Sequence, residues 1–495
     1  MHRFLWVFFP VFLAAVSLGP AFAADRDPAC QAVRECVNRE VDAGAALQRC
    51  LDHPPADGQV TLPPGVYRVL TPVRITRPLT VRTDGRDAAD GRICARDGAR
   101  DCAELVLDPR QVRETGAAQK ADFPLVVASP RVTFDHIVIS GSRGRDKSLD
   151  DAICENPAWR QRGGGLDVRG EDFRMTNSVV RNVPCLTAFS FARGRGLTVV
   201  NNWIGGNGDH TAHWADGLTV HEATEARIEH NTFVDNTDVQ LIFGGCRACQ
   251  VRGNRFLHSG APSGGAFADL MLQAWPKGSS GDYSGSVFSG NTIDCGPAKR
   301  CGFGIMLGGE PWYRVPTFGG EVVDNVVTDA MVGLNIQNLS GPMTVRGNRV
   351  IRSGGRFMGA CGQQEAAAVN IGQASRGFVD VGAIEASAGT RASALPLCIL
   401  NYPPQRRVTT LYQELLGRKP DPSGLQFWVG RLEQGASIPD IRKGILQSPE
   451  SEAAIKTALR RALRRDATSQ EVAAARQRLM TGTPLTTLQA AEPSR

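Results

Sequence analysis

Several features that define common protein classes are missing from this sequence of 495 residues. No long apolar run follows the N-terminal one, so no later segment is a candidate membrane span. Charged residues are only 21% of the chain and glycine follows no three-residue period, which excludes a disordered chain, a coiled coil and collagen. A single Cys-x-x-Cys occurs without a second one, so zinc is not expected. The 54 glycines that are present indicate a fold with many turns.

The N-terminus has the three parts of an export signal. Met1–Arg3 is positively charged, Phe4–Gly19 is apolar, and Ala21-Phe22-Ala23 has the small-x-small pattern of a cleavage site. The apolar run is shorter than the roughly 20 residues of a spanning helix. We expect residues 1–23 to be a signal peptide and the mature chain to be a secreted or periplasmic bacterial protein without a transmembrane segment.

All 13 cysteines follow the predicted cleavage site, where an oxidising compartment favours disulfides. Three pairs are close in sequence and are expected to be bonded: Cys94 with Cys102, Cys246 with Cys249, and Cys295 with Cys301. Because the total of 13 cysteines is odd, at least one thiol is unpaired. The pairing among Cys30, Cys36 and Cys50 stays open at this stage.

One short pattern recurs between about Leu166 and Val350: β-favouring residues, an Asn, one or two apolar residues, and a glycine-rich or polar turn. Asn suits such a bend because it tolerates left-handed backbone and its amide can hydrogen-bond the coils above and below. Intervals of 23 to 37 residues predict a solenoid whose coils bury their apolar faces against one another. The asparagines are Asn177, Asn202, Asn231, Asn254, Asn291, Asn325 and Asn348.

A second column of apolar strands occurs once per repeat, and strands stacked about 4.8 Å apart make a parallel β-helix. The helix-like spacing of Pro28–Leu51 predicts a helix that covers the open end of the solenoid. The first strand is expected from Val60. The strands of the column begin near Phe189, Leu218, Val239, Leu270, Phe303 and Val332.

The predicted helix, the Leu-Pro-x-Gly-x-Tyr segment ending at Tyr67 and the Asn ladder together resemble the pectate-lyase-like superfamily of right-handed β-helices. The resemblance covers roughly Pro28 to Gly362. It implies an all-β fold, a right-handed parallel β-helix, over residues 24–371.

The C-terminal part has a different organisation. Residues 372–407 are rich in Ala, Ser, Gly and Pro, a linker composition. Residues 408–495 have helical periodicity, with Ser448 and Pro449 as a helix start. The pattern L-Y-x-x-L-L-G-R-x-P-D-x-x-G-x-x-x-W from Leu411 resembles the bacterial module called domain of unknown function 4214. The resemblance implies a small all-α accessory module.

Three aspartates align within one residue on successive coils of the second column: Asp216, Asp238 and Asp269. Carboxylates stacked about 5 Å apart cannot all ionise freely, so one remains a usable acid beside a base. Alternatively, Asp216 and Asp238 could hold Ca²⁺, a hard cation that prefers oxygen ligands. No other cofactor is expected. A structural role is the competing interpretation, since Asp before a strand commonly caps its own turn.

Further candidates lie in the loops. Asp209 and His210 form an Asp-His pair that could act as a general base. Trp-Ala-Asp-Gly ending at Gly217, followed by Thr-Asp-Val-Gln-Leu from Thr237, resembles the polygalacturonase-type pattern. That resemblance implies a histidine on a nearby coil, and His258 lies near it. Aromatic faces stack on sugar rings, and cationic groups pair with uronate carboxylates. We therefore expect substrate contacts from His258, Trp275, Lys277, Trp312 and Tyr313.

These residues predict a secreted enzyme that cleaves an extracellular, acidic polysaccharide, as a hydrolase with two carboxylates or as a calcium-dependent lyase. A C5-epimerase is a variant on the same scaffold. The alternative is a noncatalytic glycan-binding or surface-attachment protein with the solenoid as a rigid rod.

The positive charge of the chain is concentrated at one end. From Pro404 to Arg495 there are 15 Lys plus Arg and 9 Asp plus Glu, which equals the net +6 of the whole chain. The arginines at 460, 461, 464 and 465 fall on one predicted helix. Because the protein is exported, we expect this helix to contact an acidic envelope or polymer rather than nucleic acid.

Overall fold

The computed structural model describes residues 28–87, 89–95, 101–110, 122–209, 213–261, 264–310, 313–359, 362–379, 385–386, 390–391, 404–433, 436, 438–481 and 483–489. The predicted signal peptide, His210 and Trp312 lie outside these residues. Among the described helices, none is long and apolar enough to cross a membrane.

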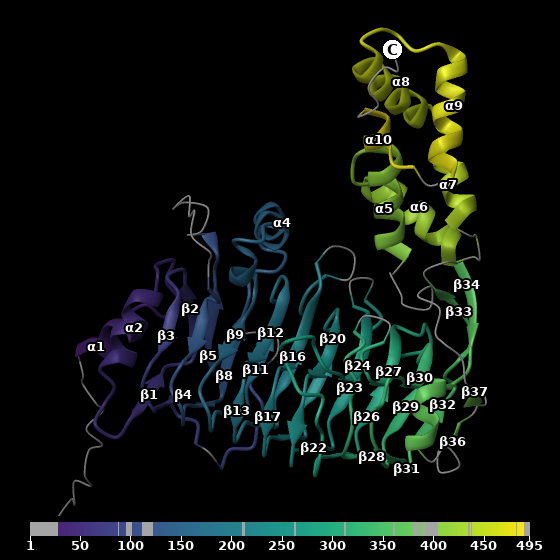
Figure 1. Cartoon of the computed structure of the whole chain (residues 1–495). Coiled ribbons are helices and arrows are strands. Elements are labelled where there is room, and N and C mark those ends of the chain that lie inside the picture. The colour runs from purple at the N-terminus through teal and green to yellow at the C-terminus, as the bar shows by residue number, and fades with distance from the viewer. Residues whose placement is uncertain are drawn as a thin grey trace, which may run out of the picture.

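The solenoid consists of three long parallel sheets, called A, B and C here, to which each coil contributes one strand (Figure 1). Each strand is hydrogen-bonded in parallel to the strand of the same sheet on the next coil, as in a parallel β-helix. Parallel crossovers are right-handed in nearly all proteins. The predicted right-handed parallel β-helix is confirmed.

The strands of each sheet follow in order. Sheet A contains β1 (Gln59–Leu62), β4 (Thr80–Thr83), β7 (Thr133–Asp135), β10 (Arg174–Thr176), β14 (Thr198–Val200), β18 (Arg227–Glu229), β22 (Gln250–Arg252), β25 (Val287–Ser289), β28 (Glu321–Val323) and β31 (Thr344–Arg346). Sheet B contains β2 (Gly65–Val69), β5 (Ala103–Leu107), β8 (Ile137–Ser140), β11 (Val179–Arg181), β15 (Trp203–Gly205), β19 (Thr232–Val234), β23 (Arg255–Leu257), β26 (Thr292–Asp294), β29 (Val326–Thr328), β32 (Arg349–Ile351) and β36 (Glu385–Ala386).

Sheet C, the predicted second column, contains β3 (Val73–Ile75), β6 (Leu125–Val127), β9 (Leu166–Val168), β12 (Leu186–Phe191), β16 (Ala215–Val220), β20 (Val239–Phe243), β24 (Ala266–Leu272), β27 (Cys301–Leu307), β30 (Val332–Ile336), β35 (Val369–Ile371) and β37 (Thr390–Arg391). Smaller sheets are formed by β13 (Gly194–Arg195), β17 (Ala223–Thr224) and β21 (Cys246–Arg247), and by the hairpin β33 (Gly355–Gly359) and β34 (Gly362–Ala366).

The asparagines form a buried ladder between sheets A and B. The side-chain NH₂ of Asn254 donates to Oδ1 of Asn291 on the next coil (3.0 Å) and to the Ile228 carbonyl of the preceding one (2.8 Å). The expected bonds to the coils above and below are thus confirmed. The left-handed residue is not the ladder Asn but the one before it, such as His230 (φ 55°). Asn177 (φ 52°) accordingly takes that preceding position, outside the ladder.

Two helices rather than one cover the N-terminal end of the solenoid, α1 (Pro28–Arg34) and α2 (Gly44–Asp52). The disulfide Cys30–Cys50 joins them and leaves Cys36 as a free thiol, which settles the open pairing. The three disulfides expected from sequence are confirmed, and Cys154–Cys185 is a further one.

The predicted linker is shorter than 372–407. The 3₁₀ helix η2 (Gln373–Phe378) follows β35, and the strands β36 and β37 still pair with β32 and β35. The sheets of the solenoid therefore continue past residue 371. The helices begin at Pro404: α5 (Pro404–Leu416), α6 (Pro422–Glu433), α7 (Ile438–Leu446), α8 (Pro449–Leu463), α9 (Ser469–Met480) and α10 (Leu485–Gln489).

These C-terminal helices have a hydrophobic core of their own, separate from that of the solenoid (Figure 1). Ser448 caps α8 by accepting from the backbone NH of Ser451, with Pro449 in the first turn, as the sequence predicts. Two of the four clustered arginines are paired within the module, Arg460 with Asp466 and Arg465 with Glu471. Part of its positive charge is therefore neutralised internally.

Candidate functional site

The register of sheet C separates the three aligned aspartates. Leu218 is paired with Leu241, so Asp216 stands opposite Val239, which is in turn paired with Ala268. Asp238 lies one residue before this position and Asp269 one residue after it. Neighbouring residues within a strand point to opposite faces, so Asp269, inside β24, faces away from the side of Asp216. Asp238 precedes β20 and lies in a turn, so this alternation does not determine its direction.

Asp216 is half-buried on the outer side of sheet C. Its Oδ2 accepts a hydrogen bond from the Thr219 hydroxyl (2.8 Å) and its Oδ1 accepts from the backbone NH of Val239 on the next coil (3.0 Å). Burial raises the pKa of Asp216 to about 6, although these hydrogen bonds and the positive charge of Arg160 act in the opposite direction. A carboxyl with this pKa is partly protonated near neutral pH.

Asp238 is the second partly exposed carboxylate of this region and directly precedes β20. Its carbonyl accepts from the backbone NH of Phe267 (2.7 Å), which fixes the turn in which it stands. Asp216 and Asp238 thus lie at the starts of successive strands of sheet C. Both oxygens of Asp216 already accept protein hydrogen bonds, which use part of their capacity to bind a cation such as Ca²⁺ that takes six to eight oxygens.

An insertion that the repeat pattern does not show lies beside these carboxylates. It contains α4 (Lys147–Glu155) and the 3₁₀ helix η1 (Arg160–Gly163), and the disulfide Cys154–Cys185 attaches α4 to the residue before β12 (Figure 1). At the next residue, Leu186 has the unusual φ of 75°. Sequence reasoning missed Arg160, and the pair Cys154 and Cys185 was the signal that could have placed this segment at the site.

A polar cluster links α4 to the loop before β16. Nε2 of His213 lies 2.8 Å from Oδ1 of Asp151, and Glu155 completes the group. Nζ of Lys419 from the C-terminal helices lies 3.4 Å from Asp151 and 3.5 Å from Glu155, so an ammonium group already balances these carboxylates. In the same loop, the backbone NH of Asp209 donates to the His213 carbonyl (2.5 Å). The predicted pairing of Asp209 with His210 falls outside the described residues.

Trp275 packs on the outer side of sheet C. A Cβ on Gly244 would lie 2.4 Å from the indole, so only glycine leaves room for it there. The ring centroids of Trp275 and His221 are 5.0 Å apart, and burial lowers the pKa of His221. Lys277 is exposed in the following turn. The structure therefore places Trp275 beyond the C-terminal ends of β16 and β20, whereas Asp216 lies at the start of β16. The indole is half-buried there.

Tyr313 lies in the loop after β27. It is half-buried, and its backbone NH donates to the carbonyl of Gly309 (2.8 Å). Its neighbour Trp312 is outside the part of the chain that the structure describes. Their predicted contact with substrate stays a prediction.

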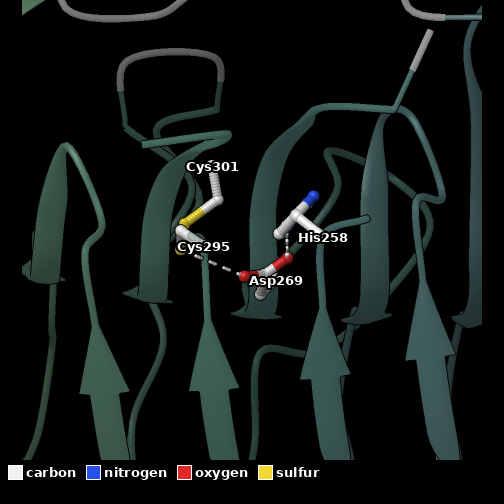
Figure 2. A group of neighbouring side chains, drawn as sticks. All are labelled: His258, Asp269, Cys295 and Cys301. Atoms are coloured by element: carbon white, nitrogen blue, oxygen red, sulfur yellow. Dashed lines mark hydrogen bonds and ion pairs between the residues drawn. A yellow bond between two sulfur atoms is a disulfide. The ribbon is translucent and has the colours of Figure 1, made fainter. Parts of the chain in front are cut away.

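The side chains of His258 and Asp269 lie next to each other inside the solenoid (Figure 2) and are fully buried. Asp216 and Asp238 are partly exposed, so they do not share this environment. Nε2 of His258 lies 3.0 Å from Oδ1 of Asp269, and its Nδ1 lies 3.6 Å from Asp235. Burial by itself would lower the pKa of His258, but the two carboxylates raise it to about 9. Gln240 donates to Asp269 (2.9 Å) and continues the polar interior. In this structure neither residue reaches the surface where a polymer would bind.

The polarity of the side chains on the outer side of sheet C changes from coil to coil. In the register that pairs successive coils, Asp167, Ser190 and Thr219 are followed by Ile242, Met271 and Met306. The later side chains belong to a buried apolar cluster that includes Phe357 of β33. The column becomes polar again at Asn335 and Asn370, so the apolar part of this face is limited to β20, β24 and β27, and Asp216 of β16 lies on the coil before it.

Comparison with known proteins identifies one family. Residues 404–455 match the Domain of unknown function (DUF4214). The helices α5 to α7 and the start of α8 form this segment, which the sequence pattern predicted. No curated protein gives a significant match to the chain.

Solved structures share the β-helix. The Dettilon tailspike protein (gp208) is 10% identical with a TM-score of 0.46, over 72% of this chain and 66% of the tailspike. The Streptococcus pneumoniae surface adhesin PfbA is 11% identical with a TM-score of 0.34, over 66% of this chain and 91% of the adhesin. A polygalacturonase from Erwinia carotovora ssp. carotovora is 13% identical with a TM-score of 0.36, over 72% of this chain and 94% of the polygalacturonase. Similarity at this level specifies no activity.

Proposed function

We propose that the protein cleaves glycosidic bonds of an acidic extracellular polysaccharide on the outer face of sheet C. The observation that carries the proposal is the half-buried Asp216, whose pKa burial raises to about 6, on the coil next to Asp238. Asp216 would protonate the leaving oxygen as general acid, and Asp238 would activate water or stabilise positive charge on the sugar.

Cationic and aromatic side chains at the two ends of the sheet C strands support an acidic substrate. Arg160 is exposed and close enough to lower the pKa of this carboxyl, and Lys277 is exposed beside Trp275. Guanidinium and ammonium groups pair with uronate carboxylates, and an indole face packs on a sugar ring. The disulfides place the protein outside the cytoplasm, where such polymers occur, and we assign it to the secreted or periplasmic proteins of a bacterium.

The test uses the mature chain with uronic and neutral polysaccharides, with and without chelator, and follows reducing ends together with the absorbance of unsaturated uronates. Asp216→Asn and Asp238→Asn should each lower turnover about 10²–10⁴-fold with an unchanged circular dichroism spectrum. Asp294→Asn, on an exposed strand of sheet B, is the matched control and should keep full activity. Equal activity in all three variants would remove these carboxylates from the mechanism.

Noncatalytic binding is the second candidate. The apolar outer face of β20, β24 and β27 favours it, because the side chains of that cluster carry no acid or base for cleavage. Retention of a polymer by the wild type without release of new ends would support this function. Loss of product in the presence of chelator would instead assign calcium a role in the cleavage.

A further inference from the structure

A row of hydroxyl groups leads from Asp216 to the neighbouring strand β12. Oγ1 of Thr219, which stands three residues later on β16, lies 2.8 Å from Oδ2 of Asp216. The same Oγ1 lies 3.0 Å from Oγ1 of Thr187 on β12, the register partner of Asp216. Oγ1 of Thr187 lies 3.1 Å from the carbonyl oxygen of Phe189. These three oxygen–oxygen contacts form a continuous series, which we call the threonine chain.

The threonine chain needs more protons than its hydroxyl groups supply. A contact between two oxygens is a hydrogen bond only when one proton lies between them. The three contacts therefore need three protons, whereas Thr187 and Thr219 have one each and a carbonyl has none. Both threonine side chains are buried, so solvent does not make up the difference. The third proton has to be the carboxyl proton of Asp216.

The hydrogen bonds of Asp216 also indicate which oxygen carries this proton. Oδ1 accepts from the backbone NH of Val239 (3.0 Å), so the proton lies on Oδ2, which faces Thr219. In this form Asp216 donates to Thr219, and Thr219 donates to Thr187. Thr187 then donates to the Phe189 carbonyl, and every contact is satisfied. In the ionised form the Thr219 hydroxyl turns to Asp216, and one of the other two contacts has no proton.

We propose that Thr187 and Thr219 hold the proton on Asp216 and are positioning residues of the site. As a donor, the Thr219 hydroxyl favours the carboxylate, but Thr187 gives it another acceptor, so that Thr219 accepts from the carboxyl OH instead. The protonated state of Asp216 follows from the chain, whereas its use as a general acid rests on the proposed function. Once Oδ2 has given its proton to a leaving oxygen, the Thr219 hydroxyl turns and donates to the new carboxylate.

The charges around Asp216 do not depend on the threonine chain. Arg160 of η1 lies near this carboxyl and favours its ionised form. On the next coil Asp238 directly precedes β20, and in the loop before β16 His213 is paired with Asp151. The strand β12 contains no charged residue, and β16 contains none besides Asp216. Removing a threonine hydroxyl therefore changes the hydrogen bonds of the carboxyl and leaves every charge in place.

The test is the titration of Asp216 in the mature full-length chain. Its protonated carboxyl gives an infrared band, which the difference from Asp216→Asn identifies. In the wild type this band should be present at about pH 5 and mostly lost by about pH 7, because the pKa is about 6. A band already absent at about pH 5 would overturn the proposal whatever the variants show.

Thr187→Val nearly keeps the shape of the side chain and removes its hydroxyl. Thr219 then loses Thr187 as an acceptor and donates to the carboxylate, so the pKa of Asp216 should fall by about one unit. Thr187→Ser restores the hydroxyl and should restore the pKa. Ser190→Ala is the matched control, because it removes a buried hydroxyl from the same strand outside the chain, and the pKa should not change. Circular dichroism checks that each variant is folded.

A double variant separates the threonine chain from a general effect on the fold. Thr219→Val interrupts the chain at the carboxyl, so adding Thr187→Val should not shift the pKa of Asp216 further. Additive shifts, or an unchanged pKa in Thr187→Val alone, would overturn the proposal. In cleavage assays, the alkaline limb of the pH profile should move to lower pH in Thr187→Val, because the general acid loses its proton earlier. A shifted pKa without turnover in the wild type would support the threonine chain and contradict the proposed function.

Discussion

At the residue scale, the site depends on a one-position offset along the strands of sheet C. Asp216 faces the outer side and Asp269 the interior, although the sequence aligns them within one residue. Only the pairing of Leu218 with Leu241 fixes the register and therefore the faces. The sequence could show that carboxylates recur at this place in the repeat, but not which of them solvent reaches.

The raised pKa of Asp216 predicts a pH-dependent cost to stability. The folded state holds the proton more tightly than the unfolded state, because the pKa rises from 3.8 to about 6 on folding. Ionisation between about pH 4 and 6 therefore favours unfolding. Relative to Asp216→Asn, which does not ionise, the wild type should lose stability from pH 4 to pH 7 in thermal unfolding. Parallel pH curves for the two proteins would contradict the raised pKa.

At the element scale, each coil is held by an Asn and by the left-handed residue before it. Asn202, Asn231 and Asn254 repeat the same contacts, so the ladder was visible as a sequence period. The left-handed position was not visible as a sequence period, because different residue types, such as His230 and Gly253, occupy it. The bend between strands requires a left-handed backbone conformation, which several residue types can adopt.

We predict that Asn254→Ala lowers the free energy of unfolding by about 2–4 kcal/mol, since Asn231 loses its acceptor and the Ile228 carbonyl its donor. Denaturant unfolding measures this change. Thr344→Ala, at an exposed strand position of sheet A, is the control and should change stability by less than about 1 kcal/mol. Equal effects of the two substitutions would show that the ladder adds little.

The α4 segment gives a second prediction at this scale. The disulfide Cys154–Cys185 spans 31 positions, and closing a loop of that size stabilises the fold by about 3–4 kcal/mol in the chain-entropy description. Replacing both cysteines by serine should lower stability by that order. It should also expose residues 142–165 to limited proteolysis and reduce turnover, because Arg160 would lose its position near Asp216. Unchanged cleavage and activity would show that the disulfide does not hold this segment at the site.

At the scale of the whole molecule, the chain has two hydrophobic cores and an uneven charge. Residues 404–495 carry the net +6, so the preceding part sums to zero. Lys419 forms exposed ion pairs with Asp151 and Glu155, and such contacts contribute at most about 1 kcal/mol each. These ion pairs therefore stabilise the contact between the C-terminal helices and the solenoid only weakly.

Removal of residues 404–495 should leave a folded β-helix. Because its core does not include the helices, calorimetry should show the solenoid transition close to its original temperature, and cleavage of soluble oligosaccharides should persist. Retention on an anionic polymer should fall, since the basic segment is gone. A truncated chain that unfolds or loses all turnover would place the helices within the functional unit.

The sequence by itself determined the solenoid, its Asn ladder, three short-range disulfides and the helical module, because each depends on a local period or on neighbours in the chain. The tertiary structure alone decided that Asp216 faces outward while His258 and Asp269 form a buried pair, and that Arg160 comes close to Asp216. These outcomes depend on strand register and on contacts between coils. A period of 23 to 37 residues sets which coils are neighbours, whereas the face of each side chain changes with every single residue.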